Sequence, residues 1–250
     1  MVRLHTWNRV HNGEDEMRIA IVGLGQIGGS MALRLKASGY DPDLFDLNSE
    51  LCKPLGGRCE IFDGHGYDLV VLALHTGTLL KMIEFLPKDN LYLDTASVKM
   101  PIVEAALQNK LNFVGGHPIA GNERTGIASW DPDLFEGRPF ATVQTGFEES
   151  PVIDEFIELL GAIRVKVDAD FHDIALAHTS QALHFVSRIV KELGEPYETL
   201  SGPGYASMTR LSKQNPLLEE TFREYNALNI SKVLDEMVER LKKISEELKK

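Results

Sequence analysis

The sequence contains no long apolar run. Its longest uninterrupted apolar stretch, at 69–74, has six residues, whereas a membrane-spanning helix needs about 20 and a signal peptide core about 7 to 15. The pattern therefore predicts neither. Residues 1–16 are mostly polar and predict a disordered N-terminal extension or an artefact of expression. We expect a cytoplasmic protein that does not interact with a membrane.

Cysteine and positive charge are also scarce. The spacing of the two cysteines, Cys52 and Cys59, matches no metal site and suggests no disulfide framework, so we expect free thiols. The 26 Lys and Arg residues are outnumbered by 37 Asp and Glu residues, which gives a net charge of −11. This charge argues against nucleic acid or an anionic membrane as a partner. An anionic substrate therefore requires a local positive group.

The most informative segment is residues 17–30, where an apolar strand leads into three glycines and then a helix. Gly23 suits a tight turn, Gly25 allows the backbone to approach a pyrophosphate, and Gly28 allows the helix to pack closely on the strand. A helix predicted over 26–38 directs its N-terminal N–H groups at the phosphates. The segment predicts a dinucleotide site.

An acidic residue ends the next predicted strand, at 43–46. Asp46 lies about 20 residues beyond Gly25, where a carboxylate accepts hydrogen bonds from ribose hydroxyls and repels a 2′-phosphate. NAD is therefore predicted rather than NADP. The alternative interpretation of the whole segment, a glycine-rich surface turn, would leave Asp46 and the strand context unexplained. The predicted cofactor contacts are Gly23, Leu24, Gly25, Gln26, Ile27, Gly28, Asp46, Leu74 and His75.

Strands and helices alternate up to residue 169, a pattern typical of an α/β protein with a doubly wound parallel sheet. The remaining predicted strands are 67–74, 91–95, 140–144 and 162–167, and the helical segments between them are 81–85, 101–111 and 153–160. Ligands bind at the carboxyl ends of such strands. Ser97 and His75 each follow a strand and are expected beside the nicotinamide half of the cofactor.

The pattern becomes helical from residue 170. The segment 171–193 carries apolar residues on all sides and predicts a buried helix that packs on its own sheet and on a partner subunit. Further helices are predicted over 205–213 and 217–248. We therefore predict an extension at 1–16, a Rossmann-type NAD-binding domain at 17–169, and an all-helical substrate and dimerisation domain at 170–250.

Three polar side chains are candidates for the chemistry, although each has a plainer interpretation. His117 follows an apolar strand and lies among glycines, where a loop histidine is either a base or an ordinary surface residue. His178 lies on the predicted buried helix and is, on this pattern alone, better explained as a satisfied core histidine. Arg210 is better explained as a surface arginine. The other histidines show no partner: His5, His11, His65, His172 and His184.

Taken together, these residues resemble the prephenate and arogenate dehydrogenases. The resemblance extends from Met17 to about Asn229. Its segments are Gly-Leu-Gly-Gln-Ile-Gly-Gly-Ser at 23–30, Ser-Val-Lys at 97–99, Gly-His-Pro-Ile-Ala-Gly-x-Glu-x-x-Gly at 116–126, His-Asp at 172–173 and Thr-Arg at 209–210. The His-Pro-Ile-Ala-Gly segment separates this family from the β-hydroxyacid dehydrogenases, which use a lysine base.

The resemblance implies NAD-dependent oxidative decarboxylation of prephenate to 4-hydroxyphenylpyruvate, in tyrosine biosynthesis, by a homodimer. It implies that His117 is the neutral base, that Ser97 orients it, and that Arg210 binds a substrate carboxylate through two parallel bonds. Glu123 matches an acid near the pocket mouth, and His178 matches a histidine beside the nicotinamide and substrate. The acid limb of the pH profile is expected at the ordinary histidine pKa of about 6.5.

The chain departs from the family pattern around the substrate side chain. Gln181 stands where the family has a second histidine, residues 204–207 replace a Gly-Phe-Arg-Asp run, and Glu219 replaces a tryptophan. Arogenate therefore remains an alternative substrate, with Glu219 as an acid near its amino group. A more distant alternative is a non-catalytic NAD-binding module cut from a longer polypeptide, since family members occur fused to chorismate mutase. The catalytic set retained here argues against that module.

Overall fold

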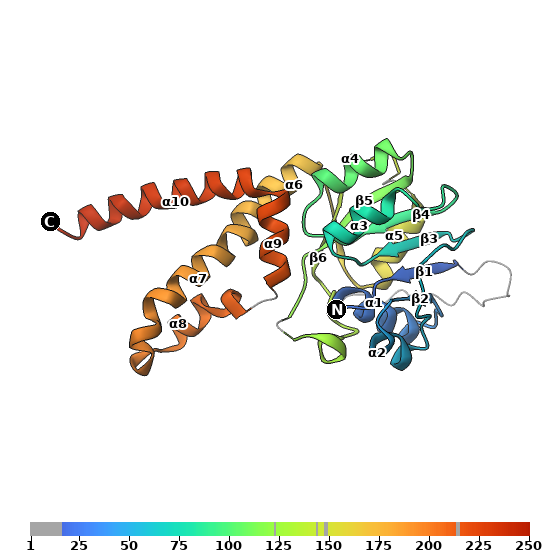
Figure 1. Ribbon diagram of the computed structural model, residues 1–250, viewed down its shortest axis with the longest axis horizontal. Helices are drawn as coiled ribbons and strands as arrows, with labels where there is room; N and C mark the ends of the chain where they lie inside the picture. Colours follow the sequence, from blue (N-terminus) through green and yellow to red (C-terminus); the bar gives the residue numbers. More distant parts are fainter. Residues whose placement is uncertain (1–16, 123, 144, 148–149, 214–215) are drawn as a thin grey trace, which may run out of the picture.

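The computed structural model describes residues 17–122, 124–143, 145–147, 150–213 and 216–250 (Figure 1). The predicted extension at 1–16 and Glu123 therefore lie outside the described residues. Seven strands form one sheet in the order β2-β1-β3-β4-β5-β6-β7. Their bounds are β1 Ile19–Val22, β2 Asp43–Phe45, β3 Leu69–Leu72, β4 Leu91–Asp94, β5 Asn112–Pro118, β6 Pro139–Val143 and β7 Ile163–Val167.

The predicted doubly wound sheet is confirmed, with one difference in strand direction. Strands β1 to β5 pair in parallel, whereas β6 runs antiparallel to β5 and β7 runs parallel to β6. A parallel neighbour requires a crossover, usually a helix. Among the described residues of the connection from β5 to β6, the short 3₁₀ turn η2 (Gly126–Ser129) is the only helical element, and the chain returns beside β5 in the opposite direction.

Helices cover both faces of the sheet. They are α1 (Gln26–Ala37), α2 (Ser49–Cys52), α3 (Thr76–Ile83), α4 (Met100–Gln108) and α5 (Pro151–Leu159), with the 3₁₀ turn η1 (Lys53–Leu55) after α2. Alternate residues of a strand point to opposite faces. Ile19 and Ile21 accordingly join the core under α1 and α5, whereas Ala20 and Val22 join the core under α3 and α4.

The C-terminal region is entirely helical and extends away from the sheet (Figure 1). Its elements are α6 (Ala169–Leu176), the π turn η3 (Ala177–Gln181), α7 (Ala182–Gly194), η4 (Glu195–Leu200), α8 (Pro203–Met208), η5 (Arg210–Lys213), α9 (Pro216–Tyr225) and α10 (Ala227–Glu247). A small core links this region to the sheet, because Val98 packs with Ala177, Ala182 and Phe222. Among the described residues, no helix is long and apolar enough to cross a membrane.

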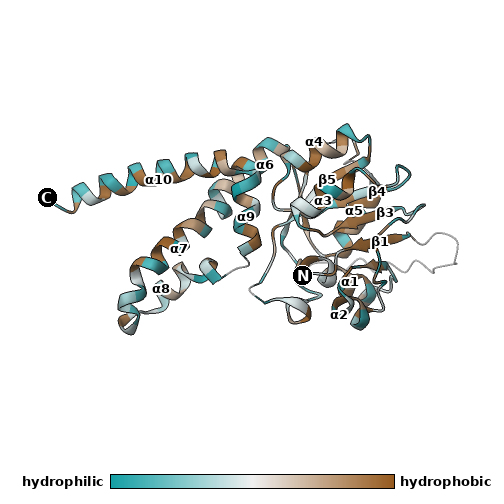
Figure 2. Cartoon of the chain, viewed as in Figure 1, coloured by the Kyte–Doolittle hydropathy of each residue, from teal (hydrophilic) through white to brown (hydrophobic). Residues whose placement is uncertain are grey.

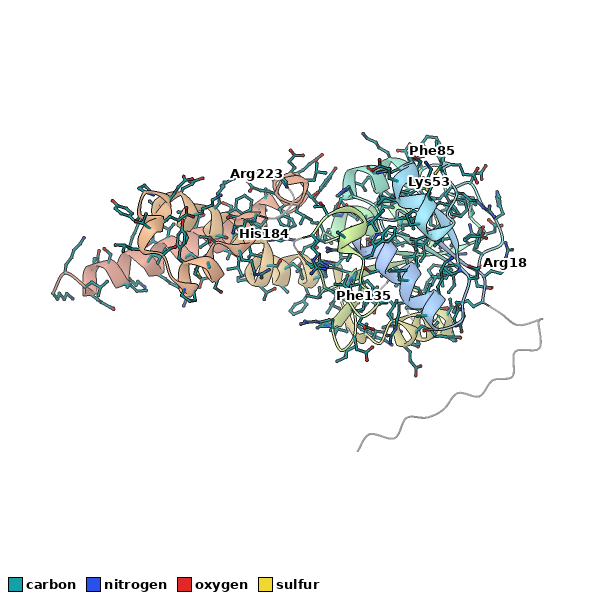
Figure 3. All side chains as sticks on the ribbon, turned by 90° about the horizontal axis from the view of Figure 1, so that it is seen from below. Arg18, Lys53, Phe85, Phe135, His184 and Arg223 are labelled. Atoms are coloured by element: carbon teal, nitrogen blue, oxygen red, sulfur yellow. The ribbon has the colours of Figure 1, made fainter. Side chains whose placement is uncertain are left out.

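The predicted helix over 171–193 is present as three consecutive helical elements, α6, η3 and α7, and it is not fully buried in the single chain. The π turn η3 interrupts it, and much of its apolar surface is exposed, with Phe171 60%, Ile189 50% and Leu193 71% accessible. Apolar residues lie along both α7 and α10 in Figure 2. Figure 3 shows His184 and Arg223 within this region; the His184 ring packs edge-on against Phe222. The helix is therefore half buried in the single chain.

Candidate active site

The glycine loop between β1 and α1 has the backbone geometry that the sequence predicts. Gly23 has a φ of +94°, which favours glycine, and a Cβ there would lie 2.3 Å from the Ala73 carbonyl oxygen. A Cβ at Gly28 would lie 1.9 Å from the Gly23 carbonyl oxygen, so only glycine allows α1 to pack this closely. At Gly25 a Cβ would meet nothing within 4 Å. The loop is therefore closely packed at Gly23 and Gly28 and has open space at Gly25.

The open side of this loop suits an anionic group. Gly25 is the N-cap of α1 and provides no side-chain cap, and the first turn of the helix contains no acidic residue. The N–H groups at the start of α1 and the positive end of its dipole therefore remain available to a phosphate. These residues fit the pyrophosphate of a dinucleotide.

Asp46 follows β2 and is hydrogen-bonded to this loop. Its Oδ2 accepts the Leu24 N–H at 2.6 Å and its Oδ1 accepts the Asn48 N–H at 2.7 Å. The Leu24 side chain is fully buried in the core, and its backbone N–H is engaged by Asp46. Asp46 thus connects the ends of β1 and β2, and its contact with a ribose stays a prediction.

A segment after β5 that includes Asn122 and Trp130 is hydrogen-bonded to the glycine loop and to the start of α1. Sequence spacing did not reveal this contact. Trp130 Nε1 donates to the carbonyl oxygens of Leu24 and Gly25 at 3.0 and 3.1 Å. Gln26 bonds Asn122 at both ends of its amide, with its Nε2 2.7 Å from Asn122 Oδ1 and its Oε1 3.1 Å from the Asn122 N–H. The segment that follows His117 is therefore fixed to the start of α1.

The predicted residues at the carboxyl ends of β3 and β4 lie at the same edge of the sheet. Leu74 lies beside the glycine loop, since a Cβ at Gly23 would come within 2.9 Å of its Cδ2. His75 is exposed and begins α3, where its carbonyl oxygen accepts the Leu79 N–H at 2.9 Å. Ser97 is half-buried just beyond β4. This common edge is where parallel sheets bind their ligands.

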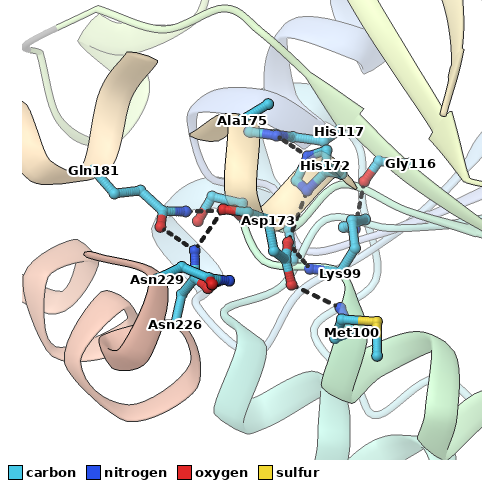
Figure 4. A network of polar contacts seen from close by, with 12 residues as sticks. Lys99, Met100, Gly116, His117, His172, Asp173, Ala175, Gln181, Asn226 and Asn229 are labelled. Carbon is cyan, nitrogen blue, oxygen red and sulfur yellow. Dashed lines mark hydrogen bonds and ion pairs between the residues drawn. The ribbon is translucent and has the colours of Figure 1, made fainter. Parts of the chain in front are cut away.

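His117 lies within a strand rather than in the loop that the sequence predicts. It belongs to β5, where it pairs with Ala141 of β6. Its Nδ1 lies 2.9 Å from His172 Nε2, and His172 Nδ1 lies 2.8 Å from Asp173 Oδ1 (Figure 4). His172, for which no partner could be predicted, is thus the direct neighbour of the predicted base. The adjacent His-Asp pair at 172–173, in a segment rich in apolar residues, was the signal for it.

Asp173 connects α6 to the start of α4. Its Oδ1 accepts the Lys99 N–H at 2.8 Å and its Oδ2 accepts the Met100 N–H at 2.9 Å. A carboxylate stabilises a helix N-terminus by accepting such donors. The same side chain therefore fixes α4 and contacts His172.

A buried ion pair, Lys99 with Asp94, contacts Gly116, the residue before His117 in β5. Lys99 Nζ bonds the Asp94 carboxylate and donates to the Gly116 carbonyl oxygen at 2.6 Å, and both ionic side chains are completely buried. Asp94 also accepts the N–H groups of Ala96 and Gly116, each at 2.9 Å. Burial lowers the pKa of Lys99 while Asp94 opposes that shift. The pair joins the carboxyl end of β4 to β5 one residue before His117.

The expected pKa of about 6.5 for His117 is too high, because its surroundings lower it. Burial lowers the pKa of His117 well below its ordinary value, and His172 and the Lys99 cation lower it further. The expectation of a pKa near 6.5 ignored burial and these two neighbours, neither of which is adjacent to His117 in sequence. His117 is therefore neutral throughout the physiological pH range, as a base must be.

Ser97 contacts the helical region through its backbone. Its carbonyl oxygen accepts the Gln181 Nε2 at 3.0 Å, and Gln181 Oε1 accepts Asn226 Nδ2 at 2.6 Å. Gln181, one of the departures from the family pattern, is completely buried and connects η3 to both β4 and α10. Within the part of the chain that the structure describes, no hydrogen bond joins the Ser97 hydroxyl to His117, so its orienting role stays a prediction.

The remaining predicted residues lie on the helical region. His178 is exposed on the π turn, with its Nδ1 2.9 Å from the Ile174 carbonyl oxygen, so its interpretation as a core histidine is wrong. π turns occur frequently at functional sites. Arg210 is exposed at the start of η5, and its charge lowers the pKa of His184, which burial already lowers. The Ser212 N–H anchors η5 to α7 through Ser187 Oγ at 3.0 Å.

Glu219 has partners within the helical region. Its Oε1 accepts Arg188 from α7 at 2.6 Å and Arg223 within α9 at 2.7 Å. These hydrogen bonds and positive charges lower the pKa of Glu219. The carboxylate connects two helices, which weakens the hypothesis that it receives the amino group of arogenate.

The fold and the glycine loop define a nucleotide-binding protein of the Rossmann type. Two family models match the chain: the nucleotide-binding domain of prephenate dehydrogenase over residues 65–169 and the dimerization domain of prephenate dehydrogenase over residues 168–250. Together they cover most of the chain, which therefore belongs to the prephenate dehydrogenase family.

Curated relatives agree with this assignment. The chain is 27% identical over 225 residues to a prephenate dehydrogenase of Lactococcus lactis subsp. cremoris, covering 80% of this chain and 62% of that protein. It is 31% identical over 174 residues to the probable prephenate dehydrogenase NovF of Streptomyces niveus, covering 64% of this chain and 48% of that protein. The chain thus spans about half to two thirds of the length of these relatives.

Solved structures share the whole arrangement. Prephenate dehydrogenase of A. aeolicus, in complex with hydroxyphenyl propionate and NAD+, has a TM-score of 0.78 at 25% identity, covering 94% of this chain and 91% of that one. Arogenate dehydrogenase of Synechocystis has a TM-score of 0.73 at 25% identity, covering 93% and 92%. Both the sheet and the helical region therefore have counterparts in enzymes of this family.

Proposed function

We propose that the chain catalyses the NAD-dependent oxidative decarboxylation of prephenate to 4-hydroxyphenylpyruvate. The observation that carries the proposal is a half-buried, neutral histidine, His117, at the same sheet edge as an open glycine loop. Family membership and the NAD+ complex of the A. aeolicus relative support it. NAD, when bound, accepts the hydride from the substrate ring.

The side chains of this protein supply binding and proton transfer. His117 accepts the proton of the ring hydroxyl at Nε2, because its Nδ1 already contacts His172. Arg210 binds a substrate carboxylate, the local positive group that an acidic protein needs. Ser97 orients the substrate hydroxyl and His178 lies beside the nicotinamide. The role predicted for Glu123 concerns a residue outside those that the structure describes. The open glycine loop, Leu74, His75 and the Asp46 carboxylate hold the dinucleotide.

The direct test is the initial rate of reduced cofactor formation with prephenate and with arogenate, each with NAD and with NADP. We expect turnover with prephenate and NAD, because Asp46 repels a 2′-phosphate. A higher kcat/KM with arogenate would identify the other substrate of the family instead. If no pair gave a rate while NAD still bound in calorimetry, the chain would be a binding module.

We further propose that the chain forms a homodimer through its helical region. The match to a dimerization domain supports this, as do exposed apolar side chains on α7, η4 and α10, including Leu193, Leu200 and Leu241. Sedimentation at micromolar concentration should give about twice 27.9 kDa. Leu241→Glu should shift the protein towards monomer, whereas Lys243→Glu on the same helix should not. A wild-type species of only 27.9 kDa would count against the dimer.

Two further points stay predictions. Location in the cytoplasm is testable by cell fractionation. Fusion to or association with a chorismate mutase is testable by purification of the protein from its own cells with its neighbours intact.

A further inference from the structure

We propose that His172 and Asp173 are positioning residues that fix His117 as one tautomer, with its proton on Nδ1 and its lone pair on Nε2. The inference rests on the proposed function in one respect only, the acceptance of the substrate's hydroxyl proton by that lone pair. The tautomer itself follows from three hydrogen-bonded groups in a row, drawn in Figure 4.

The first step concerns Asp173, whose oxygens act as acceptors. They receive the backbone N–H groups of Lys99 and Met100, which can only donate. His172 Nδ1 lies 2.8 Å from Asp173 Oδ1. An unprotonated ring nitrogen at this distance would place two lone pairs against each other, so His172 Nδ1 carries a proton.

The second step concerns the charge of His172. The residue is only 2% exposed, and burial and the nearby Lys99 cation lower its pKa against the opposing effect of Asp173. A neutral imidazole has a single N–H. Since that N–H is on Nδ1, His172 Nε2 is an acceptor, and His117 Nδ1, 2.9 Å away, must donate to it.

The third step concerns His117. The charged and titratable groups around it are His172 and Asp173 from α6, Asp94 from β4, and Lys99 from the turn before α4. Burial keeps His117 neutral in this setting, and its one proton is held on Nδ1. Its Nε2 therefore presents a lone pair before any substrate arrives. When Nε2 takes a proton, the negative charge of Asp173 stabilises the new positive charge through His172, as the aspartate does for histidine in serine hydrolases.

The wild-type chain without ligands allows a direct test by nuclear magnetic resonance. Long-range ¹H–¹⁵N correlations distinguish protonated from unprotonated ring nitrogens, and His117→Asn identifies the His117 signals by their loss. At pH 7.5 we expect His117 to carry its proton on Nδ1. A proton on Nε2 would overturn the proposal. This result does not depend on turnover, so failure of the proposed function and failure of this inference are distinguishable.

Kinetics provide the second test. His172→Asn removes the nitrogen that faces His117, and we expect kcat to fall roughly 100-fold while the Kd for NAD stays unchanged. His172→Gln should retain more activity, because its Oε1 can reach the position of Nε2 and accept the same proton. His65→Asn is the matched control, since it breaks the surface pair of His65 and Asp89. A kcat for His172→Asn within twofold of wild type would refute the positioning role.

Discussion

His117→Asn should lower kcat by about 10³-fold and leave the Kd for NAD unchanged. Asparagine can keep an N–H directed at His172 Nε2, which now lies 2.9 Å from His117 Nδ1, but it has no basic nitrogen in place of Nε2. The substitution thus removes proton acceptance while preserving the hydrogen bond behind it. Steady-state rates and calorimetry with NAD measure the two effects. A kcat near that of wild type would show that another group is the base.

The pH profile of the wild-type protein provides an independent check on the same residue. A base must be unprotonated, so activity falls as pH drops through its pKa. Burial, His172 and Lys99 all lower the pKa of His117. We therefore expect kcat/KM to stay flat as pH falls from 8 through the ordinary histidine value of about 6.5, and to decline only at more acidic pH. A half-maximal rate at about 6.5 would mean that the base titrates as an exposed histidine does.

Lys99→Met should lower the free energy of unfolding by about 3 to 5 kcal/mol, the usual result of breaking a buried ion pair. The substitution leaves the Asp94 carboxylate completely buried without its cation and leaves the Gly116 carbonyl oxygen without the Nζ donor. For a chain of this size the Tm should fall by about 10 °C, which calorimetry or circular dichroism measures.

The matched control for this prediction is Lys242→Met on α10. Lys242 pairs with Glu239 at 2.8 Å, but both side chains are more than 60% exposed, and such pairs contribute little to stability. Its Tm should stay close to that of wild type. Equal changes in the two variants would mean that the buried pair contributes no more than a surface pair.

The sheet was predictable because its requirements are local. The positive φ of Gly23 and the close packing at Gly28 restrict those positions to glycine, and alternating burial along β1 follows from side-chain direction alone. The antiparallel direction of β6 was not predictable in this way. It depends on the connection between β5 and β6, whose described residues form no crossover helix. The π turn η3 was also not predictable from the sequence, because its residues include no glycine or proline.

The site was predictable only in part. His117 and Ser97 could be singled out as candidates because each follows an apolar stretch of the sequence. His172 could not be paired with His117, since 55 residues separate them and spacing along the chain carries no information on such a contact. The pKa of His117 depends on this contact and on Lys99, so its direction became visible only in the folded chain.

The contact between His117 and His172 crosses the boundary between the two family domains. His117 belongs to the nucleotide-binding part, while His172 and Asp173 belong to the dimerization part. Asn226 of the α9–α10 junction fixes Asp173 from within the dimerization part, through its bond to the Asp173 carbonyl oxygen at 2.8 Å. The proposed cofactor site and the proposed proton transfer are therefore expected to respond differently to changes at this boundary. A displacement of the helical region would break the contact between His117 and His172 and leave the glycine loop intact, so the proposed proton transfer requires the two halves to stay docked.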